Sequence, residues 1–304
     1  MKPADYLEKE DLQRFTARSD AIAWLWFLGN WAAIIAIFAV VAAYPNPLTI
    51  LLALPLLAGR QLGLTVLMHD AGHGTLFRTP WLNDFVGQYF CALPTFNDQP
   101  SYAKGHLEHH RKAGSHDDPD LPNYAAYPVD SDSFKRKMWR DLTGQTGFKL
   151  LAYIARGASG VVSGGADPRN TGVFRKQLLA QLVLILLLSA AGHPWLYLLW
   201  LGAFLTFFMA IIRIRQVAEH AAVPDLYDPD PRMNTRTVDA PWWQRILFAP
   251  NGVNYHMEHH FMASVPCYRL KALRQHLARR GALDEVPRFA GYGQLLKHVI
   301  VAPA

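Results

Sequence analysis

Four long apolar stretches alternate with polar segments along the chain. Residues 21–43, AIAWLWFLGNWAAIIAIFAVVAA, carry no charge, and residues 48–68 form a second run that Arg60 and Gln61 interrupt. A helix over the first run would rise roughly 34 Å, enough to cross a hydrocarbon core of about 30 Å. Two further runs occupy residues 178–191 and 195–214. The pattern therefore predicts four transmembrane helices.

The segments between these runs differ in charge. The turns YPNP (44–47) and GHP (192–194) contain no lysine or arginine, whereas the amino terminus, residues 101–177 and everything after Ile212 are rich in both. Basic residues favour the cytoplasmic side of a membrane. We therefore expect an all-α integral membrane fold in which the four helices form two hairpins and both termini are cytoplasmic.

The remaining polar segments are expected to form a helical cap on the cytoplasmic side. This cap would comprise residues 69–177 and 215–304, within a single membrane domain that covers residues 1–304. Arg213 and Arg215 follow the last apolar run directly. We interpret both as anchors at the cytoplasmic mouth of the fourth span.

Composition adds little to this picture but excludes some sites. The net charge of +6 and the pI of about 9.3 suit an anionic partner such as lipid head groups or an acidic protein, and we expect no nucleic acid. Cys91 and Cys267 form no CxxC motif, which argues against a disulfide framework and a thiolate metal site. Residues 81–96 are too short to span and are predicted as an interfacial or re-entrant helix pair. The glycine- and serine-rich stretch 157–172 is predicted as flexible.

Histidines cluster at four places, all on the predicted cytoplasmic side. The motifs HDAGH (69–73), HLEHH (106–110) and HMEHH (256–260) are joined by AEH, which ends at His220. Histidines four apart share a helix face and can hold one metal ion. In each HxxHH motif we expect the histidines at motif positions one and four to share an ion and the histidine at position five to reach a second ion. The repeated motif therefore predicts a dinuclear centre.

The ligand type restricts the metal. Imidazole suits iron, copper, zinc and nickel, whereas magnesium and calcium prefer oxygen ligands. A structural zinc site closes with about four ligands and would not need eight or nine histidines. Two metals that share so many neutral ligands beside a membrane suit O₂ activation at iron best.

These motifs, together with DDPD (117–120) and NYHMEHH (254–260), resemble the integral-membrane fatty acid desaturase family, whose relatives include hydroxylases and ketolases. The resemblance extends to SVPCYRL at 264–270 and implies a non-haem diiron enzyme. Such an enzyme uses O₂ and two electrons to introduce a C=C bond into a fatty acyl or lipid chain. The resemblance implies nine metal ligands: His69, His73, His106, His109, His110, His220, His256, His259 and His260.

Several neighbours of these histidines are candidates for supporting them. Gln216 stands where some family members hold a water-binding amide. Four carboxylates could accept the far ring N–H of a ligand histidine, or could equally be ordinary solvated groups. They are Asp70, Glu108, Glu219 and Glu258. The segment HDDPD (116–120) could bind metal on its own, but a turn that caps the second motif is the favoured interpretation.

Other functions and partners stay open. A hydroxylase or ketolase acting on a lipid, sphingolipid or carotenoid would share every feature, whereas a metal transporter is a remote alternative because its ligands should lie within the spans. No haem-binding, ferredoxin or Rossmann motif is present, so we expect a separate electron donor of the ferredoxin, rubredoxin or cytochrome b5 type. The donor or anionic lipid would contact the basic residues Lys135, Arg136, Lys137 and Arg140.

Overall fold

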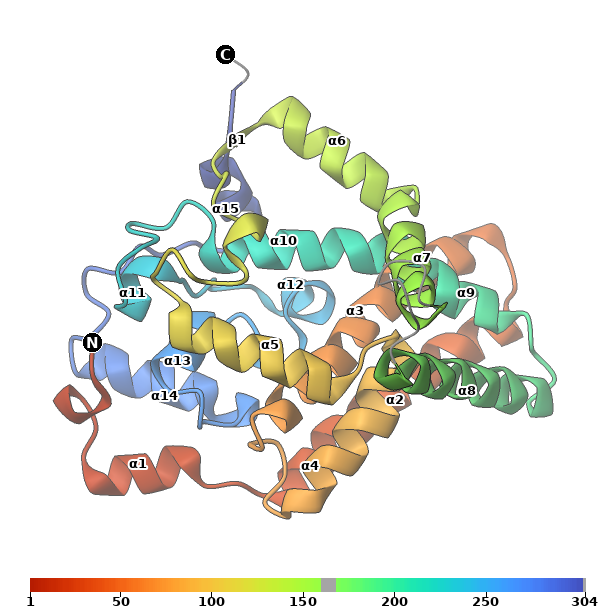
Figure 1. Ribbon diagram of the computed structural model, residues 1–304, viewed down its shortest axis with the longest axis horizontal. Helices are drawn as coiled ribbons and strands as arrows, with labels where there is room; N and C mark the ends of the chain where they lie inside the picture. Colours follow the sequence, from red (N-terminus) through yellow and green to blue (C-terminus); the bar gives the residue numbers. More distant parts are fainter. Residues whose placement is uncertain (160–167, 303–304) are drawn as a thin grey trace.

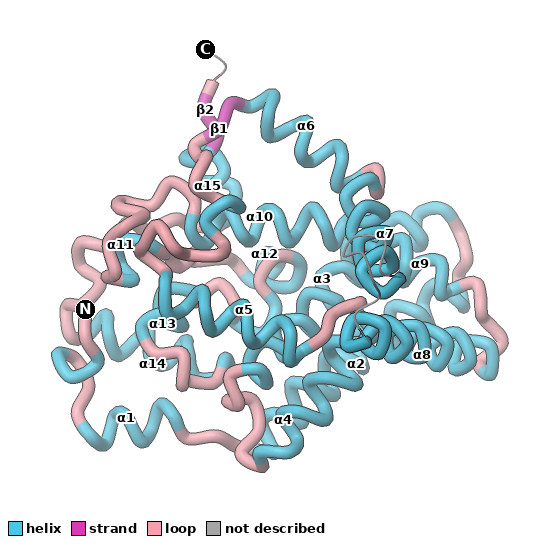
Figure 2. The backbone as a smooth tube through the Cα atoms, viewed as in Figure 1, coloured by secondary structure: helices cyan, strands magenta, loops and turns pink. Residues whose placement is uncertain are grey.

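The protein is almost entirely helical. The computed structural model describes residues 1–159 and 168–302, so part of the stretch 157–172 predicted as flexible lies outside the described residues. Figure 2 shows the two short strands of the described chain, β1 (Val129–Asp130) and β2 (Ile300–Val301), which pair in parallel. Everything that positions the site is therefore built from helices and loops.

Among the described residues, four helices are long and apolar enough to cross a membrane, as predicted. They are α2 (Asp20–Ala43), α3 (Pro47–Gly72), α8 (Pro168–Ala190) and a continuous helix made of α9 (Leu196–Ala203), the π-helical turn η5 (Phe204–Phe208) and α10 (Met209–His220). The predicted boundaries at residues 68, 178 and 214 were too narrow. Helical hydrogen bonding continues past the apolar run in α3 and α10, and both extensions carry histidines of the site.

Polar residues inside the long helices are hydrogen-bonded to neighbouring helices. The Asn30 side chain donates to the Arg60 carbonyl (3.1 Å), and the Gln61 side chain donates to the Trp200 carbonyl (2.8 Å). The Arg60 guanidinium donates to the Ile246 carbonyl (2.6 Å). A polar group in an apolar environment is costly unless it is paired in this way. These contacts explain why α3 tolerates the two polar residues that interrupt its sequence, and they tie α3 to α2 and α9.

The stretch predicted as a helix pair is one bent helical segment instead. It consists of α4 (Pro80–Val86), the π-helical turn η2 (Gly87–Ala92) and the 3₁₀ turn η3 (Leu93–Thr95), and it ends where Phe96 adopts a φ of 57°. The helix type changes along this segment, so the chain bends without a break. Gly87 lies against α3, and a Cβ there would come within 2.7 Å of the Ala71 Cβ. Only glycine permits this close packing beside the site.

The shorter helices gather at the end of the long helices that carries the site, opposite the turns 44–46 and 191–195 (Figure 1). α7 packs against the π-helical turn η5, where a Cβ on Gly147 would lie 2.6 Å from the Leu205 carbonyl oxygen. The remaining helices are α1 (Lys9–Thr16), α5 (Gln99–Lys112), α6 (Ser131–Leu142), α7 (Gln145–Ser159), α11 (Pro231–Asn234), α12 (Trp242–Leu247), α13 (His256–Phe261), α14 (Cys267–Arg279), α15 (Tyr292–Val299) and the 3₁₀ turns η1 (Pro3–Asp5), η4 (Leu121–Asn123) and η6 (Pro250–Gly252).

Candidate metal centre

All nine predicted histidines come together in two adjoining groups. Within each group the nearest ligand atoms lie within 4.8 Å of one another. The rings of His110 and His260, one from each group, stack with their centroids 4.2 Å apart. The first group contains His69, His73, His106, His110 and His259, and the second contains His109, His220, His256 and His260.

The two HxxHH helices each serve both groups. On α5, His106 and His110 join the first group while His109 turns to the second; on α13, His256 and His260 join the second group while His259 turns to the first. The predicted pairing of the histidines at motif positions one and four was therefore wrong, because positions one and five share a group. Four residues advance about 40° beyond one helical turn, whereas three fall about 60° short of it, so the i, i+4 pair is better aligned.

The ends of two long helices complete the groups. His69 lies in the last turn of α3, and His73 is the residue at which that helix ends. His220 is the final residue of α10. The extension of both helices beyond their apolar runs therefore brings three histidines to the bundle end, where α5 and α13 supply the other six.

The imidazole nitrogens converge on each other. The Nε2 atom of His110 lies 2.9 Å from Nε2 of both His106 and His259, and in the second group Nε2 of His256 lies 2.9 Å from Nε2 of His220. Within the described part of the chain, the buried Nε2 atom of His73 has no hydrogen-bond partner. Nitrogen atoms packed in this way leave lone pairs directed at a common point, which is where a cation would bind.

Burial keeps these rings uncharged. Desolvation, followed by repulsion from neighbouring imidazoles, lowers the pKa of His73 to about 3 and the pKa of His110 to about 2. The same causes lower the pKa well below its ordinary value for His106, His256, His259 and His260. Neutral imidazole is the form that coordinates metal. The donor set therefore fits two metal ions of the kind that prefer nitrogen ligands.

Some of the outer ring nitrogens are fixed by hydrogen bonds. Nδ1 of His109 lies 2.8 Å from the Asp118 carboxylate, which also accepts a hydrogen bond from the Tyr124 hydroxyl. Burial raises the pKa of Asp118, but the hydrogen bonds from His109 and Tyr124 outweigh it and lower that pKa overall. Nδ1 of His220 donates to the Asn234 carbonyl oxygen (3.0 Å). Such partners hold the proton on Nδ1 and leave Nε2 free to face inward.

Two of the four predicted carboxylates lie beside a histidine. Asp70 is 3.4 Å from Nδ1 of His69 and accepts the backbone N–H of Cys267 (2.6 Å). Glu219 is 3.7 Å from Nδ1 of His256 and accepts a hydrogen bond from the Arg215 guanidinium (2.6 Å). Asp70 thus lies beside a histidine of its own helix, and Glu219 lies beside a histidine of α13 but beyond hydrogen-bond distance, so their supporting role stays a prediction.

The other two carboxylates have different partners, and for them the interpretation as histidine supports was wrong. Glu108 is on the outer face of α5 and pairs with Arg111 and Lys112. Glu258 is fully buried and binds the Thr237 hydroxyl and the Arg274 guanidinium. Asp118, which was interpreted as part of a capping turn, takes the supporting role. Its signal was the acidic HDDPD segment directly after the second motif.

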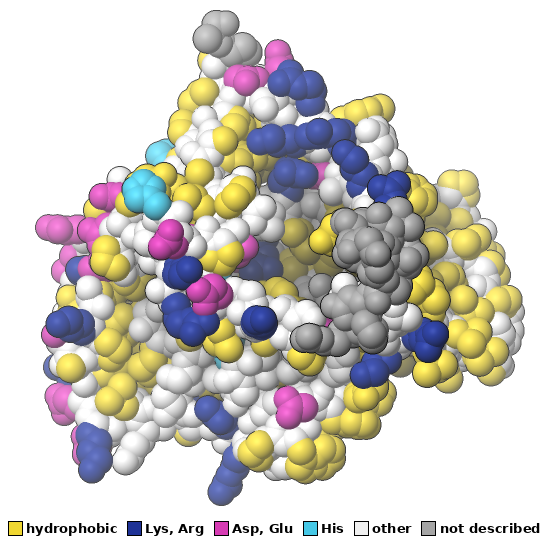
Figure 3. Space-filling view, in the orientation of Figure 1, with side chains coloured by type: hydrophobic (Ala, Val, Ile, Leu, Met, Phe, Trp, Pro, Cys, Tyr) yellow, Lys and Arg dark blue, Asp and Glu magenta, His cyan; other side chains and the backbone are white. Residues whose placement is uncertain are grey.

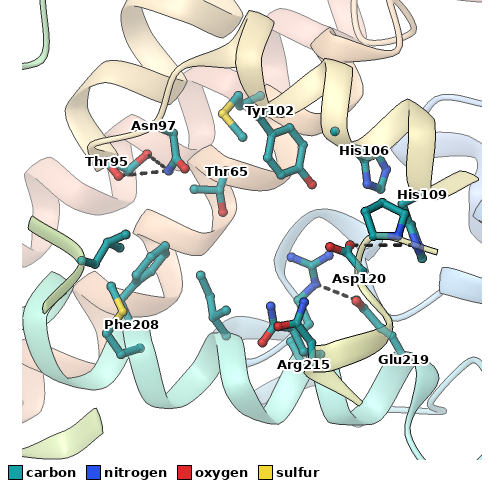
Figure 4. Close-up of a pocket in the computed structure, with 18 of the residues that line it drawn as sticks. Thr65, Thr95, Asn97, Tyr102, His106, His109, Asp120, Phe208, Arg215 and Glu219 are labelled. Carbon is teal, nitrogen blue, oxygen red and sulfur yellow. Dashed lines mark hydrogen bonds and ion pairs between the residues drawn. The ribbon is translucent and has the colours of Figure 1, made fainter. Parts of the chain in front are cut away.

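A cavity of about 490 Å³ opens beside the two groups. In Figure 4, Tyr102 and His106 face Asp120, Arg215 and Glu219 across this cavity, and Phe208 lies toward its far end. Gln216, the predicted water-binding amide, also lines the cavity. Pockets of this size accommodate small organic ligands.

The described chain thus combines four helices that could span a membrane with two histidine groups that could hold metal ions, beside a cavity. The chain matches the family model "Fatty acid desaturase" over residues 45–292. It belongs to this family of oxidoreductases.

Relatives in this family share about a quarter of their residues with the chain. A dihydrorhizobitoxine desaturase from Bradyrhizobium elkanii is 26% identical over 229 residues, which cover 72% of this chain and 65% of the relative. An sn-1 oleoyl-lipid 12-desaturase from Picosynechococcus sp. is 25% identical over 270 residues, which cover 82% of this chain and 74% of the relative. An enzyme of the same name from Anabaena variabilis is 25% identical over 236 residues, which cover 69% of this chain and 63% of the relative. The chain thus spans just under two thirds of the first and third relatives.

Proposed function

We propose that this protein is an O₂-dependent membrane desaturase that introduces a C=C bond into a fatty acyl or lipid substrate. The observation that carries the proposal is the pair of neutral histidine groups beside a single cavity. Two iron ions held there would supply the O₂ activation needed to remove hydrogen from an unactivated C–H bond. All nine histidines are proposed as their ligands, five for one ion and four for the other.

The chain's own residues prepare this chemistry in two ways. Asp118 and the Asn234 carbonyl fix the protonated nitrogen of His109 and His220, so that both rings keep their orientation. The cavity wall made by Phe204 and Phe208 gives an apolar substrate a site from which water is displaced. The names of the relatives, which specify oleoyl lipid and dihydrorhizobitoxine, agree with an organic substrate that enters such a cavity.

The membrane orientation is part of the proposal. The four spans would form two hairpins within one domain, with both termini and the helical cap on the cytoplasmic side. The support is the charge pattern, because the short turns lack lysine and arginine while the cap is rich in both. A substrate from the bilayer and electrons from the cytoplasm would then reach the same site.

A separate electron carrier of the ferredoxin, rubredoxin or cytochrome b5 type is proposed to dock on α6. Figure 3 shows lysine and arginine side chains gathered over this part of the surface. Lys137 packs over the Tyr127 ring at 4.6 Å, and Lys135 is paired with the exposed Asp132. An acidic carrier would be attracted to this surface.

Charge removal tests the docking surface. Replacing Lys135, Arg136, Lys137 and Arg140 by glutamine should slow reduction by the carrier and leave membrane association unchanged. The matched control removes four exposed basic residues on α14 and after it: Lys271, Arg279, Arg280 and Arg288. Loss of membrane association in the α6 variant would show that this surface binds anionic lipid instead.

The proposed reaction is tested by lipid mass spectrometry of a bacterial host that expresses the protein. A product lighter by two hydrogen atoms, absent with His106→Ala and retained with His193→Ala, is the expected result. His193 lies in the turn between α8 and α9, outside both histidine groups. A product heavier by one oxygen atom would make the protein a hydroxylase. Metal uptake by the host without either product would favour the remote alternative, a metal transporter.

A further inference from the structure

The cavity beside the histidines is chemically divided. The end that contains Phe208 is uncharged in Figure 4, where its labelled neighbours are Thr95 and Asn97, and Phe204 and Ile212 also line the cavity. The end next to His109 and His256 is charged, because three ionisable side chains line it. They are Asp120, Arg215 and Glu219. A plain methylene chain that reacted beside the histidines would have to lie against this charged wall, although its apolar surface gains nothing from such neighbours.

Arg215 is held in a fixed position within that wall. Its Nε atom donates to Glu219 Oε1 at 2.6 Å, and the same oxygen lies 3.7 Å from Nδ1 of His256. The Arg215 side chain is 16% exposed, and in Figure 4 its guanidinium is turned into the cavity. Glu219 therefore lies between the Arg215 guanidinium and the imidazole of His256.

The part of this guanidinium that Glu219 does not engage has the geometry of an anion-binding group. Arginine carries five N–H donors, and Glu219 engages the Nε side. The terminal N–H groups form a planar fork that matches the two oxygens of a carboxylate. Tyr102, on the opposite wall, brings a hydroxyl to the same space. Glu219 holds the guanidinium so that the fork faces the cavity and not the protein interior.

We propose that Arg215 binds the carboxylate of the substrate, and that the substrate is therefore a free carboxylic acid rather than an esterified lipid. Its reacting carbons would lie a few bonds from the carboxylate, and its apolar remainder would extend toward Phe204 and Phe208. This inference rests on the proposed function, since it names the substrate class for the same cavity. Arg215 acts as a specificity-determining residue, with Glu219 as its positioning partner.

Binding without turnover tests this assignment. The iron-loaded full chain, in lipid nanodiscs and without a reductant, is titrated with octanoate and with the uncharged octanamide by calorimetry. The wild type is expected to bind octanoate tenfold to a hundredfold more tightly, the range expected for hydrogen bonds to a charged group. Arg215→Gln should abolish the preference, and Arg215→Lys should retain part of it.

Two further variants separate recognition from folding. Arg213→Gln is the matched control, because Arg213 lies on the same helix and pairs with Asp141 outside the cavity. It should keep the preference for octanoate. The double variant Arg215→Gln/Glu219→Gln removes the ion pair without leaving a lone buried charge, and it should lose the preference while it still binds octanamide.

Equal affinity of the wild type for both probes would overturn the proposal. It would also be overturned if Arg215→Gln lost iron and bound both probes equally less well, since Arg215 would then act only through Glu219 on His256. Because no turnover is needed, the result is independent of the reaction: a preference for octanoate with no desaturated product would reject the desaturase and keep the carboxylate site. A desaturated product from a protein that binds octanoate and octanamide equally would keep the desaturase and reject the carboxylate site.

Discussion

The two HxxHH motifs have the same spacing, with glutamate as the third residue of each, yet their surroundings differ. The first lies on α5, a helix of 14 residues in which only Gln99 and His109 are buried. The second forms most of α13, a helix of 6 residues of which five are buried. The histidines play equivalent parts in both copies, because they are placed by helical spacing. The glutamates do not, because burial determines what each of them can bind.

Glu108 and Glu258 illustrate this difference. Glu108 faces outward and pairs with Arg111 and Lys112, and solvent screens such surface ion pairs so that they contribute little to stability. Glu258 has no exposed side-chain surface, and its charge is compensated by Arg274 and the Thr237 hydroxyl. A repeat in the sequence therefore predicts a repeated function for the metal-binding residues but not for the residues between them.

The largest effect is expected from His109 and His259, the histidines that each motif contributes to the group of the other motif. Replacing His109 by alanine should disturb the same iron as His256→Ala, while His259→Ala should disturb the same iron as His106→Ala. Each variant should lose more activity than the roughly 10–100-fold that loss of an outer partner costs. Mössbauer spectra and iron content per chain test the assignment, with His193→Ala as control. If His109→Ala matched His106→Ala instead, the crossed arrangement would be wrong.

Loss of the buried glutamate should mainly reduce stability. Glu258→Gln leaves the Arg274 guanidinium with Asp239 as its remaining acidic partner. Breaking a buried ion pair costs about 3–5 kcal/mol, and we expect the lower end of this range because Asp239 remains. Denaturant unfolding in detergent measures the change. A variant as stable as the wild type would show that the pair of Glu258 with Arg274 does not stabilise the fold.

An intermediate effect is expected at the carboxylate that supports the first copy. Asp118→Asn keeps the size of the side chain but weakens the hold on Nδ1 of His109. Iron affinity should fall about 10–100-fold. Asp117→Asn is the matched control, since Asp117 is exposed on the neighbouring position. Equal iron affinity in the two variants would remove Asp118 from the site.

The smallest effect is expected for the exposed glutamate. Glu108→Gln removes only surface ion pairs with Arg111 and Lys112. Stability should stay close to that of the wild type, and iron content should stay at the wild-type level. The measurements are the same as for Glu258→Gln, so the two variants compare the copies directly. A marked loss of iron in Glu108→Gln would mean that Glu108 reaches the histidines in solution.

The sequence predicted the four spans and the gathering of the histidines, because both depend on local patterns. Hydropathy determines a span, and the spacing within HxxHH brings imidazoles to one side of a helix. It predicted the wrong pairs within each motif, since i, i+3 and i, i+4 residues both lie on one face. Which pair shares a group also depends on where α13 lies relative to α5. Asp118 and Arg215 were assigned to a turn and to a membrane anchor, although their partners His109 and Glu219 lie only nine and four residues away. Their roles depend on the fold of the loop after α5 and on the cavity beside α10, and neither follows from a spacing rule.

The π-helical turn η5 affects how the last long helix would respond to the loss of one residue. A π-helical turn holds one residue more than the α-helical turn it replaces. In the helix from Leu196 to His220, this extra residue precedes the part that carries Arg215, Glu219 and His220. Deleting one residue from 204–208 would convert the π-helical turn into an α-helical turn and leave the direction of the residues after it nearly unchanged. A deletion between Met209 and Ile214 would instead rotate the residues after it by about 100° relative to α9. The π-helical turn is therefore the place where this helix can lose a residue without turning Arg215, Glu219 and His220 away from the site.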